Sequence, residues 1–276
     1  MLAFAANSLL CRMALGQELM DAASFATVRV ISGAVTLSLI VLPRWRARGR
    51  SSTDWRSGAM LFTYMVCFSF AYLSLSAGTG ALILFGAVQV TMFVKALRGG
   101  EPFPLLSWAG LMLAILGLVY LVSPGVTAPD PLGAVLMAMA GVAWGIYSLL
   151  GRGAVDPLEA TANNFIVAVP LVLIVNLVFV GELSGSARGL ALAAASGASA
   201  SGLGYVAWYA ALRGLTATRA ATVQLSVPVI AAFGGIILLA EAPTLRLALA
   251  SAATLGGIGL VLARQVAPPA TIGARA

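Results

Sequence analysis

Residues 205–262 decide the fold of this chain, and they read YVAWYAALRGLTATRAATVQLSVPVIAAFGGIILLAEAPTLRLALASAATLGGIGLVL. The stretch predicts the end of one apolar helix, a basic turn, a helix broken by Pro228, a turn at Glu241 and a Gly-rich last helix. Residues 64–121 follow the same order of elements half a chain length earlier, with Glu101 in the place of Glu241. Few residues are identical between the two stretches. A chain that repeats itself at half length nevertheless predicts a binding site between two similar halves.

The composition requires a membrane as solvent. Of 276 residues, 61% are hydrophobic and only 9% are charged, whereas about 25% of the residues of a soluble domain are charged. Histidine is absent, which excludes His-ligated metal sites and Ser-His triads. We expect no cofactor and no metal. Cys11 and Cys67 lie in apolar runs and are expected to be small packing residues.

Apolar segments of roughly 17–25 residues cross a bilayer. Charged, Pro and Gly positions divide the chain into ten such segments, about 1–16, 22–42, 57–76, 79–97, 104–123, 131–151, 159–180, 187–212, 216–239 and 244–264. They predict one membrane domain over 1–276, with a first repeat over about 1–124 and a second over about 131–264.

The lysines and arginines fall mainly in alternate connections between these segments. One side receives Arg44, Arg46, Arg48, Arg50, Arg56, Lys95, Arg98, Arg152, Arg213, Arg219, Arg264 and Arg275, and the other receives Arg188 and Arg246. By the positive-inside rule, both termini are cytoplasmic, and the +7 net charge is an orientation signal that does not point to nucleic acid. A repeat of five helices is necessarily inverted. The predicted fold is an all-α membrane protein with ten transmembrane helices, arranged as two inverted five-helix repeats around a central cavity.

Aromatic and amide side chains near mid-span are the candidate substrate contacts. They are Asn7, Ser8, Tyr64, Phe68, Gln89, Trp144, Tyr147, Tyr205, Trp208 and Gln224. The rings would supply apolar and stacking contact, and the amides and Ser8 would hydrogen-bond a zwitterion. The alternatives are an interfacial aromatic belt and pairing of the glutamines between helices.

Arg12 and Arg29 are costly at membrane depth. We expect a gating or structural role for both, with contact to a substrate carboxylate as the alternative, and Arg29 can pair with Glu18 or Asp21. Glu101 and Glu241 are expected to cap or turn helices, because the topology places them on opposite surfaces. None of the nine acidic residues falls in mid-helix, which argues against coupling through a buried carboxylate.

Small residues and prolines predict how the helices pack. Gly141 and Gly145 form a Gly-xxx-Gly pair, and residues 193–204 are almost only Ala, Ser and Gly. Such faces let helix backbones approach closely, in a fixed contact or in one that slides. Pro228 is expected to kink its helix.

Together, Arg29, the Pro228…Glu241…Gly256-Gly257 pattern and the Glu101…Gly117 pattern resemble the EamA-type branch of the drug/metabolite transporter (DMT) superfamily. Tyr64-x-x-Cys67, Trp144-x-x-Tyr147 and Tyr205-x-x-Trp208 resemble the YddG-type aromatic amino-acid exporters. The resemblance implies two inverted five-helix repeats, a cavity walled by helices 1, 3, 4, 6, 8 and 9, and export of amino acids or related metabolites. Family members often carry a proline in helix 4 that matches Pro228, but here that region reads Val88-Gln89-Val90-Thr91, so we expect the halves to flex unequally.

The sequence therefore predicts a transporter of the bacterial inner membrane, whose partners are a small-molecule substrate and the lipid bilayer. We expect facilitative export of amino acids, aromatic and apolar ones above all, by alternating access. A transporter of another metabolite or drug is the first alternative. A polytopic membrane enzyme such as a lipid-group transferase is remote, because that chemistry uses paired acids with Mg²⁺ or a His base.

Overall fold

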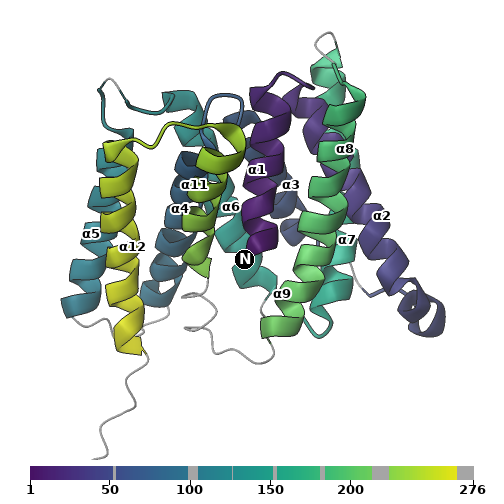
Figure 1. Cartoon of the computed structure of the whole chain (residues 1–276). Coiled ribbons are helices and arrows are strands. Elements are labelled where there is room, and N and C mark those ends of the chain that lie inside the picture. The colour runs from purple at the N-terminus through teal and green to yellow at the C-terminus, as the bar shows by residue number, and fades with distance from the viewer. Residues whose placement is uncertain are drawn as a thin grey trace, which may run out of the picture.

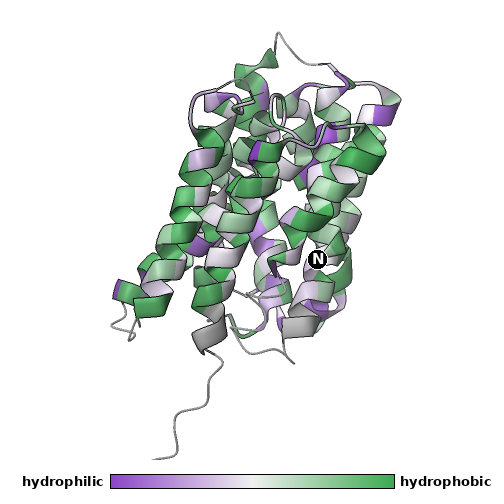
Figure 2. Ribbon diagram, turned by 60° about the vertical axis from the view of Figure 1, so that its left-hand side comes forward, coloured by the Kyte–Doolittle hydropathy of each residue, from purple (hydrophilic) through white to green (hydrophobic). Residues whose placement is uncertain are grey.

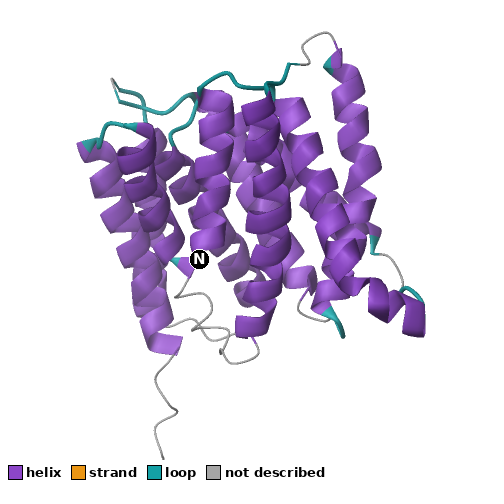
Figure 3. Ribbon diagram, turned by 45° about the vertical axis from the view of Figure 1, so that its right-hand side comes forward, coloured by secondary structure: helices purple, strands orange, loops and turns teal. Residues whose placement is uncertain are grey.

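The computed structural model describes residues 1–51, 54–98, 105–125, 127–151, 154–180, 184–212 and 224–265. Within these ranges the chain is a bundle of helices, and the pairing of Met20 with Gly185 is its only β-type contact (Figures 1 and 3). Five positions used in the sequence predictions lie outside the described residues: Glu101, Arg152, Arg213, Arg219 and Arg275.

The helices follow the order of the predicted apolar segments. They are α1 (Leu2–Gly16), α2 (Ala22–Arg48), α3 (Trp55–Ala71), α4 (Ala77–Arg98), α5 (Leu105–Val122), α6 (Pro131–Gly151), α7 (Pro157–Val178), α8 (Ala187–Ala195), the π-helix η2 (Ser196–Leu203), α9 (Gly204–Leu212), α11 (Ser226–Leu239) and α12 (Leu245–Gln265). α8, η2 and α9 run on without a break and form one span. Among the described residues, six helical segments are long and apolar enough to cross a membrane, and α1, α11 and most of α12 are shorter apolar helices.

Polar side chains mark where helices begin. Asp21, Asp54 and Asp156 each accept a hydrogen bond from a backbone N–H in the first turn of α2, α3 and α7, and Ser186 does the same for α8. Such caps satisfy N–H groups that have no partner within the helix. These acidic residues therefore lie at helix ends, outside the apolar interior.

Pro228 lies just after a break in the helical backbone, because Gln224 is helical and Leu225 is in a turn. α11 begins at Ser226, so this proline lies in the first helical turn, where its missing N–H breaks no helical hydrogen bond. The interruption at Leu225, between helical Gln224 and α11, is compatible with the expected break at Pro228, which stays a prediction. Residues 213–223 are outside the described part of the chain.

Close contacts between small residues hold neighbouring helices together. A Cβ on Gly141 would lie 2.5 Å from the carbonyl oxygen of Leu84, and one on Gly145 would lie 2.9 Å from Thr91. The predicted Gly-xxx-Gly face therefore packs α6 against α4. α5 and α12 pack together in the same way, because a Cβ on either Gly110 or Gly257 would overlap the carbonyl oxygen of the other.

The hydropathy of the bundle matches a protein surrounded by lipid. Hydrophobic residues cover the length of the helices and hydrophilic ones gather towards the ends (Figure 2). Large apolar side chains such as Leu105, Val119 and Ile237 are exposed on the outside. Inside the bundle, α1 packs against α8, η2 and α11, and α6 packs against α3 and α4.

Hydrogen bonds tie the turns together at both ends of the bundle. We call the upper face the end that carries the turns 17–21, 72–76, 123–130 and 240–244 (Figure 1). At the opposite, lower face, the Arg44 guanidinium pairs with Asp156 at 2.6 Å, and the Trp45 indole N–H donates to Glu159 at 3.0 Å. These bonds hold the end of α2 against the start of α7.

Asp21 couples two turns of the upper face, and its role predicts a pH dependence. Its carboxylate accepts from the backbone N–H groups of Ser24 and Ser184, both at 2.8 Å. Partial burial raises the pKa of Asp21, but these hydrogen bonds outweigh burial and the pKa falls below its ordinary value of 3.8. A lowered pKa stabilises the folded state above the ordinary value, and this stability is lost as the pH falls through the folded pKa.

We therefore expect the wild type to lose thermal stability in detergent as the pH is lowered below about 4, with part of that loss due to Asp21. In Asp21→Asn, which keeps a capping residue, this part of the pH dependence should be absent. Thermal unfolding of both proteins between pH 7 and pH 3 measures it. If the unfolding temperatures of the two proteins fall in parallel as the pH is lowered, Asp21 does not contribute to the pH dependence.

Candidate functional site

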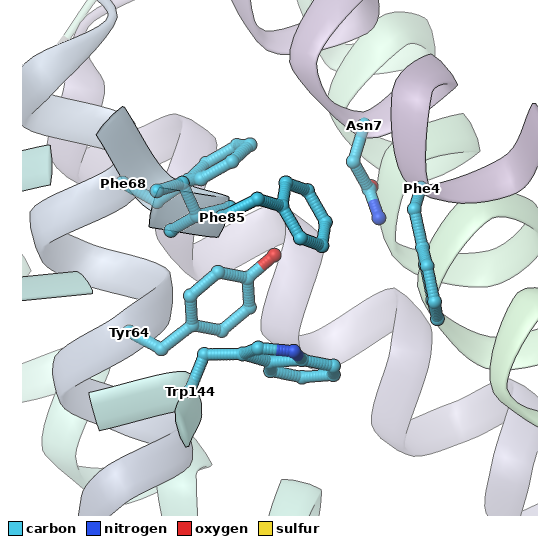
Figure 4. A pocket seen from close by; sticks show the side chains of 7 residues that line it. Phe4, Asn7, Tyr64, Phe68, Phe85 and Trp144 are labelled. Carbon is cyan, nitrogen blue, oxygen red and sulfur yellow. The ribbon is translucent and has the colours of Figure 1, made fainter. Parts of the chain in front are cut away.

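Among the described residues, an enclosed cavity lies between α1, α3, α4 and α6. Its lining is Phe4, Asn7, Tyr64, Phe68, Leu84, Phe85 and Trp144 (Figure 4). The cavity measures ≈ 10 Å³, which is room for about one water molecule. The side chains of the described residues thus leave little room between these four helices in this conformation, and any larger molecule needs the walls to move apart.

An aromatic cluster builds the walls of this cavity. The ring centroid of Trp144 lies 4.9 Å from that of Tyr64, 5.3 Å from Tyr205 and 5.5 Å from Tyr147. Phe4 meets Trp144 edge-on at 6.1 Å. Separations of 4.5–7 Å with tilted rings are the preferred geometry of aromatic pairs, so this cluster holds its shape without a ligand.

Arg29 lies behind the cavity wall and is fully buried, with 0% of its surface exposed. Its Nη2 donates to the Tyr64 hydroxyl at 3.0 Å, and its Nε donates to Ser201 Oγ at 3.4 Å. The guanidinium carbon is 4.6 Å from the Phe68 ring centroid and 5.3 Å from that of Tyr64. The predicted pairing with Glu18 or Asp21 is therefore wrong, because the side chain turns into the bundle and Asp21 caps α2.

Asn7 connects the cavity to Arg29 through the π-helix. Its Oδ1 accepts from Ser196 Oγ at 2.8 Å and from Ser201 Oγ at 3.3 Å. Ser201 in turn accepts from Arg29. Short π-helical segments occur frequently at functional sites, and here η2 directs two hydroxyls of one span at the same amide. The result is a continuous polar path from the cavity to a buried cation.

The structure separates the predicted contact residues into two groups. Asn7, Tyr64, Phe68 and Trp144 line the cavity. The others lie outside its lining: Tyr205 and Trp208 pack around Phe4, Tyr147 hydrogen-bonds Thr161, Ser8 and Gln89 are buried in α1 and α4, and Gln224 is half-buried two residues before α11.

Three lining residues were not predicted: Phe4, Leu84 and Phe85. Spacing gives the signal that could have found two of them. Phe4 precedes Asn7 by three positions and Phe85 precedes Gln89 by four, and residues at these spacings share a helix face. An amide in an apolar helix thus identifies the inward face and its neighbours.

Arg12 belongs to a different cluster, at the upper face. Its Nε lies 3.4 Å from Glu241 Oε1, and its Nη1 donates to the carbonyl oxygen of Tyr72 at 3.1 Å. Both carboxylate oxygens of Glu241 accept from the backbone N–H of Ala77, at 2.9 and 3.0 Å. Glu241 therefore caps α4 and joins it to α1 and to the turn after α11.

Glu241→Ala should lower the free energy of unfolding by about 1–2 kcal/mol, because it removes a helix cap and the anion beside Arg12. Glu241→Gln keeps an acceptor for the Ala77 N–H and should lose less. Chemical unfolding in mixed micelles measures both variants. Equal losses would show that the charge alone matters, and no loss in either would contradict the capping role.

Comparison with known proteins identifies the family. The sequence profile of the EamA-like transporter family matches residues 131–263. An uncharacterized protein of Pseudomonas aeruginosa is 50% identical over 274 residues, which are 99% of this chain and 96% of that protein. Residues 131–263 thus form an EamA-like transporter domain. This confirms the predicted membrane transporter of the drug/metabolite transporter superfamily and points away from an enzyme.

More distant relatives also point to a transporter. Two uncharacterized transporters of Archaeoglobus fulgidus are 26% and 27% identical over 206 and 230 residues, which are 73% and 78% of this chain and 74% and 78% of theirs. A crystal structure of another protein, 19% identical, covers 94% of this chain and 96% of its own with a TM-score of 0.67. That structure shares the fold.

Proposed function

We propose that this EamA-like transporter exports amino acids, preferring aromatic and apolar side chains, by alternating access around the central cavity. The observation that carries the proposal is the lining, in which Tyr64, Phe68 and Trp144 surround one amide, Asn7. Rings offer stacking and apolar contact to a side chain. The amide and the hydroxyls behind it offer hydrogen bonds to the charged groups of a zwitterion.

We also propose that the fold consists of two inverted five-helix repeats. The packing partners support it, because exchanging α1–α5 with α6–α12 reproduces the largest of the observed helix contacts. α6 packs on α3 and α4 as α1 packs on η2 and α11, while α2 with α7 and α5 with α12 are pairs between the halves. In such folds the site lies near mid-membrane between the repeats, and rocking of one bundle against the other alternates access.

We place the lower face and both termini in the cytoplasm of a bacterial inner membrane. The basic end of α2, with Arg44, Arg46 and Arg48, lies at that face, as the positive-inside rule requires. The upper face with the Arg12–Glu241 pair is then the outer one. Transport requires the contacts at the two faces to open in turn.

Transport is proposed to be facilitative. Among the described residues, the carboxylates of Asp21, Asp54, Asp156 and Glu241 are held at helix ends by backbone N–H groups, and no cluster of three or more metal-ligating side chains is present. Carriers driven by protons or sodium usually keep a carboxylate within the membrane. The sequence and the described structure therefore favour movement down the gradient of the cargo.

Flux of radiolabelled amino acids into proteoliposomes that contain the purified chain tests the function. We expect uptake of phenylalanine, tryptophan and leucine to exceed that of empty liposomes and to persist without pH or sodium gradients. Strict dependence on either gradient would overturn the facilitative mechanism. Transport of cationic drugs or nucleobases but of no amino acid would support the alternative cargo within the same superfamily.

A further inference from the structure

A buried positive charge, Arg29, has no anionic partner among the described residues and lies next to the central cavity. Arg29 is 0% exposed, and its Nη1 has no hydrogen-bond partner. Ion pairs between described residues join Arg12 to Glu241 and Arg44 to Asp156, and none includes Arg29. Its neighbours are uncharged rings and hydroxyls: Tyr64, Phe68 and Ser201.

Such an arrangement is incomplete on physical grounds. A guanidinium carries five N–H donors and stays ionised. Contacts with the faces of two rings recover only part of the cost of taking this charge out of water. A buried charge is normally paired with an opposite one. The carboxylates of Asp21 and Glu241 are already held by backbone N–H groups and, for Glu241, by Arg12.

The polar contacts of Arg29 lead to the cavity and nowhere else among the described residues. Tyr64 and Phe68 separate the guanidinium from the cavity and line it. Ser201 accepts from Arg29 and donates to Asn7, which also lines the cavity. A modest turn of the Tyr64 ring would expose the guanidinium to a molecule in the cavity.

We propose that Arg29 is the subsite for the carboxylate of the cargo. In the loaded state the carboxylate of the cargo pairs with the guanidinium. Nη1, which has no partner among the described residues, donates to it, and Nη2 donates to it in place of the Tyr64 hydroxyl. The rings of the cavity contact the rest of the cargo. A guanidinium matches a carboxylate with two parallel hydrogen bonds. The inference rests on the proposed function and deepens it: the cargo must carry a carboxylate, and its ammonium is secondary.

Three molecules that share a phenylethyl group separate these requirements: L-phenylalanine, 3-phenylpropionate, which lacks the ammonium, and phenethylamine, which lacks the carboxylate. Each molecule is tested as an inhibitor of the flux of labelled L-phenylalanine into proteoliposomes. Its effect on the thermal unfolding temperature of the full chain in detergent is measured as well. We expect 3-phenylpropionate to bind nearly as well as phenylalanine, and phenethylamine at least about tenfold more weakly.

Arg29→Gln should remove this preference for carboxylates, and Arg29→Lys should keep part of it. Arg12→Gln is the matched control, because it removes an arginine that already has a carboxylate partner. Its binding of 3-phenylpropionate relative to phenethylamine should stay that of the wild type. Should Arg29→Gln fail to fold, the wild-type series and Arg29→Lys still decide. Equal or stronger binding of phenethylamine by the wild type, or an unchanged preference in folded Arg29→Gln, overturns the subsite.

The outcomes also distinguish failure of the carboxylate subsite from failure of the proposed amino-acid transport. If labelled L-phenylalanine is not transported but 3-phenylpropionate raises the unfolding temperature in an Arg29-dependent way, the cargo is a different carboxylate and the subsite stands. If L-phenylalanine is transported without any preference for carboxylates, amino-acid export stands and the subsite is wrong.

Discussion

Replacing Gly197 with valine is expected to cost the folded protein more than the roughly 1–3 kcal/mol of an ordinary overpacked core position. Gly197 lies in η2, and a Cβ there would overlap the carbonyl oxygen of Arg29 and the Oγ of Ser32 in α2. The carbonyl oxygen of Arg29 belongs to the backbone of α2, so it cannot rotate away as a side chain can. The whole span must therefore move from α2, and Ser201 moves with it.

Gly197→Val should consequently lose both stability and transport, measured as unfolding temperature in detergent and as flux in proteoliposomes. Gly256→Val is the matched control, because a Cβ at this exposed position of α12 meets nothing within 4 Å and valine suits a helix better than glycine does. A Gly197→Val protein as stable as the control would mean that α2 and η2 separate easily.

Trp144→Ala is expected to have the second large effect. Trp144 forms four ring pairs in the aromatic cluster, with partners on α1, α3 and α9 as well as in its own helix. Removing a buried tryptophan costs about 3–5 kcal/mol where the site cannot collapse. The enlarged cavity should also lose its fit to an aromatic side chain, and we expect at least about a tenfold fall in selectivity for phenylalanine over alanine.

Trp208→Ala provides the comparison, because this tryptophan is half-buried and its ring meets Phe4 at 5.8 Å outside the cavity lining. It should lose less stability and keep the selectivity. Flux of both amino acids and unfolding in micelles measure the two variants. The reverse order of effects would move the cargo site from Trp144 towards α9.

The sequence predicted the membrane class and the course of the helices because hydrophobic length and charged turns are strong local signals. It also indicated four of the seven residues that line the cavity: Tyr64, Phe68, Trp144 and Asn7 are mid-span polar or aromatic residues, and these meet between the helices. Phe4 and Phe85 were missed because a phenylalanine in an apolar helix looks the same whether it faces lipid or the interior.

The surroundings of Arg29 could not be predicted, since they depend on helix rotation and on a distant span. Arg29 lies eight residues beyond the cap of α2, about 12 Å along the axis at 1.5 Å per residue, so Asp21 is out of reach. The Ala, Ser and Gly run suggested close packing, and α2 does approach η2 closely. Nothing in its composition indicated a π-helix that would place Ser196 and Ser201 on one amide.

The size of the central cavity matters for the membrane as an electrical insulator. A space of ≈ 10 Å³ holds about one water, and a lone water cannot form a chain for protons across roughly 30 Å of hydrocarbon. In this conformation the described part of the bundle is expected to block the passage of protons through this cavity. A cell could then hold many copies without discharging its membrane voltage.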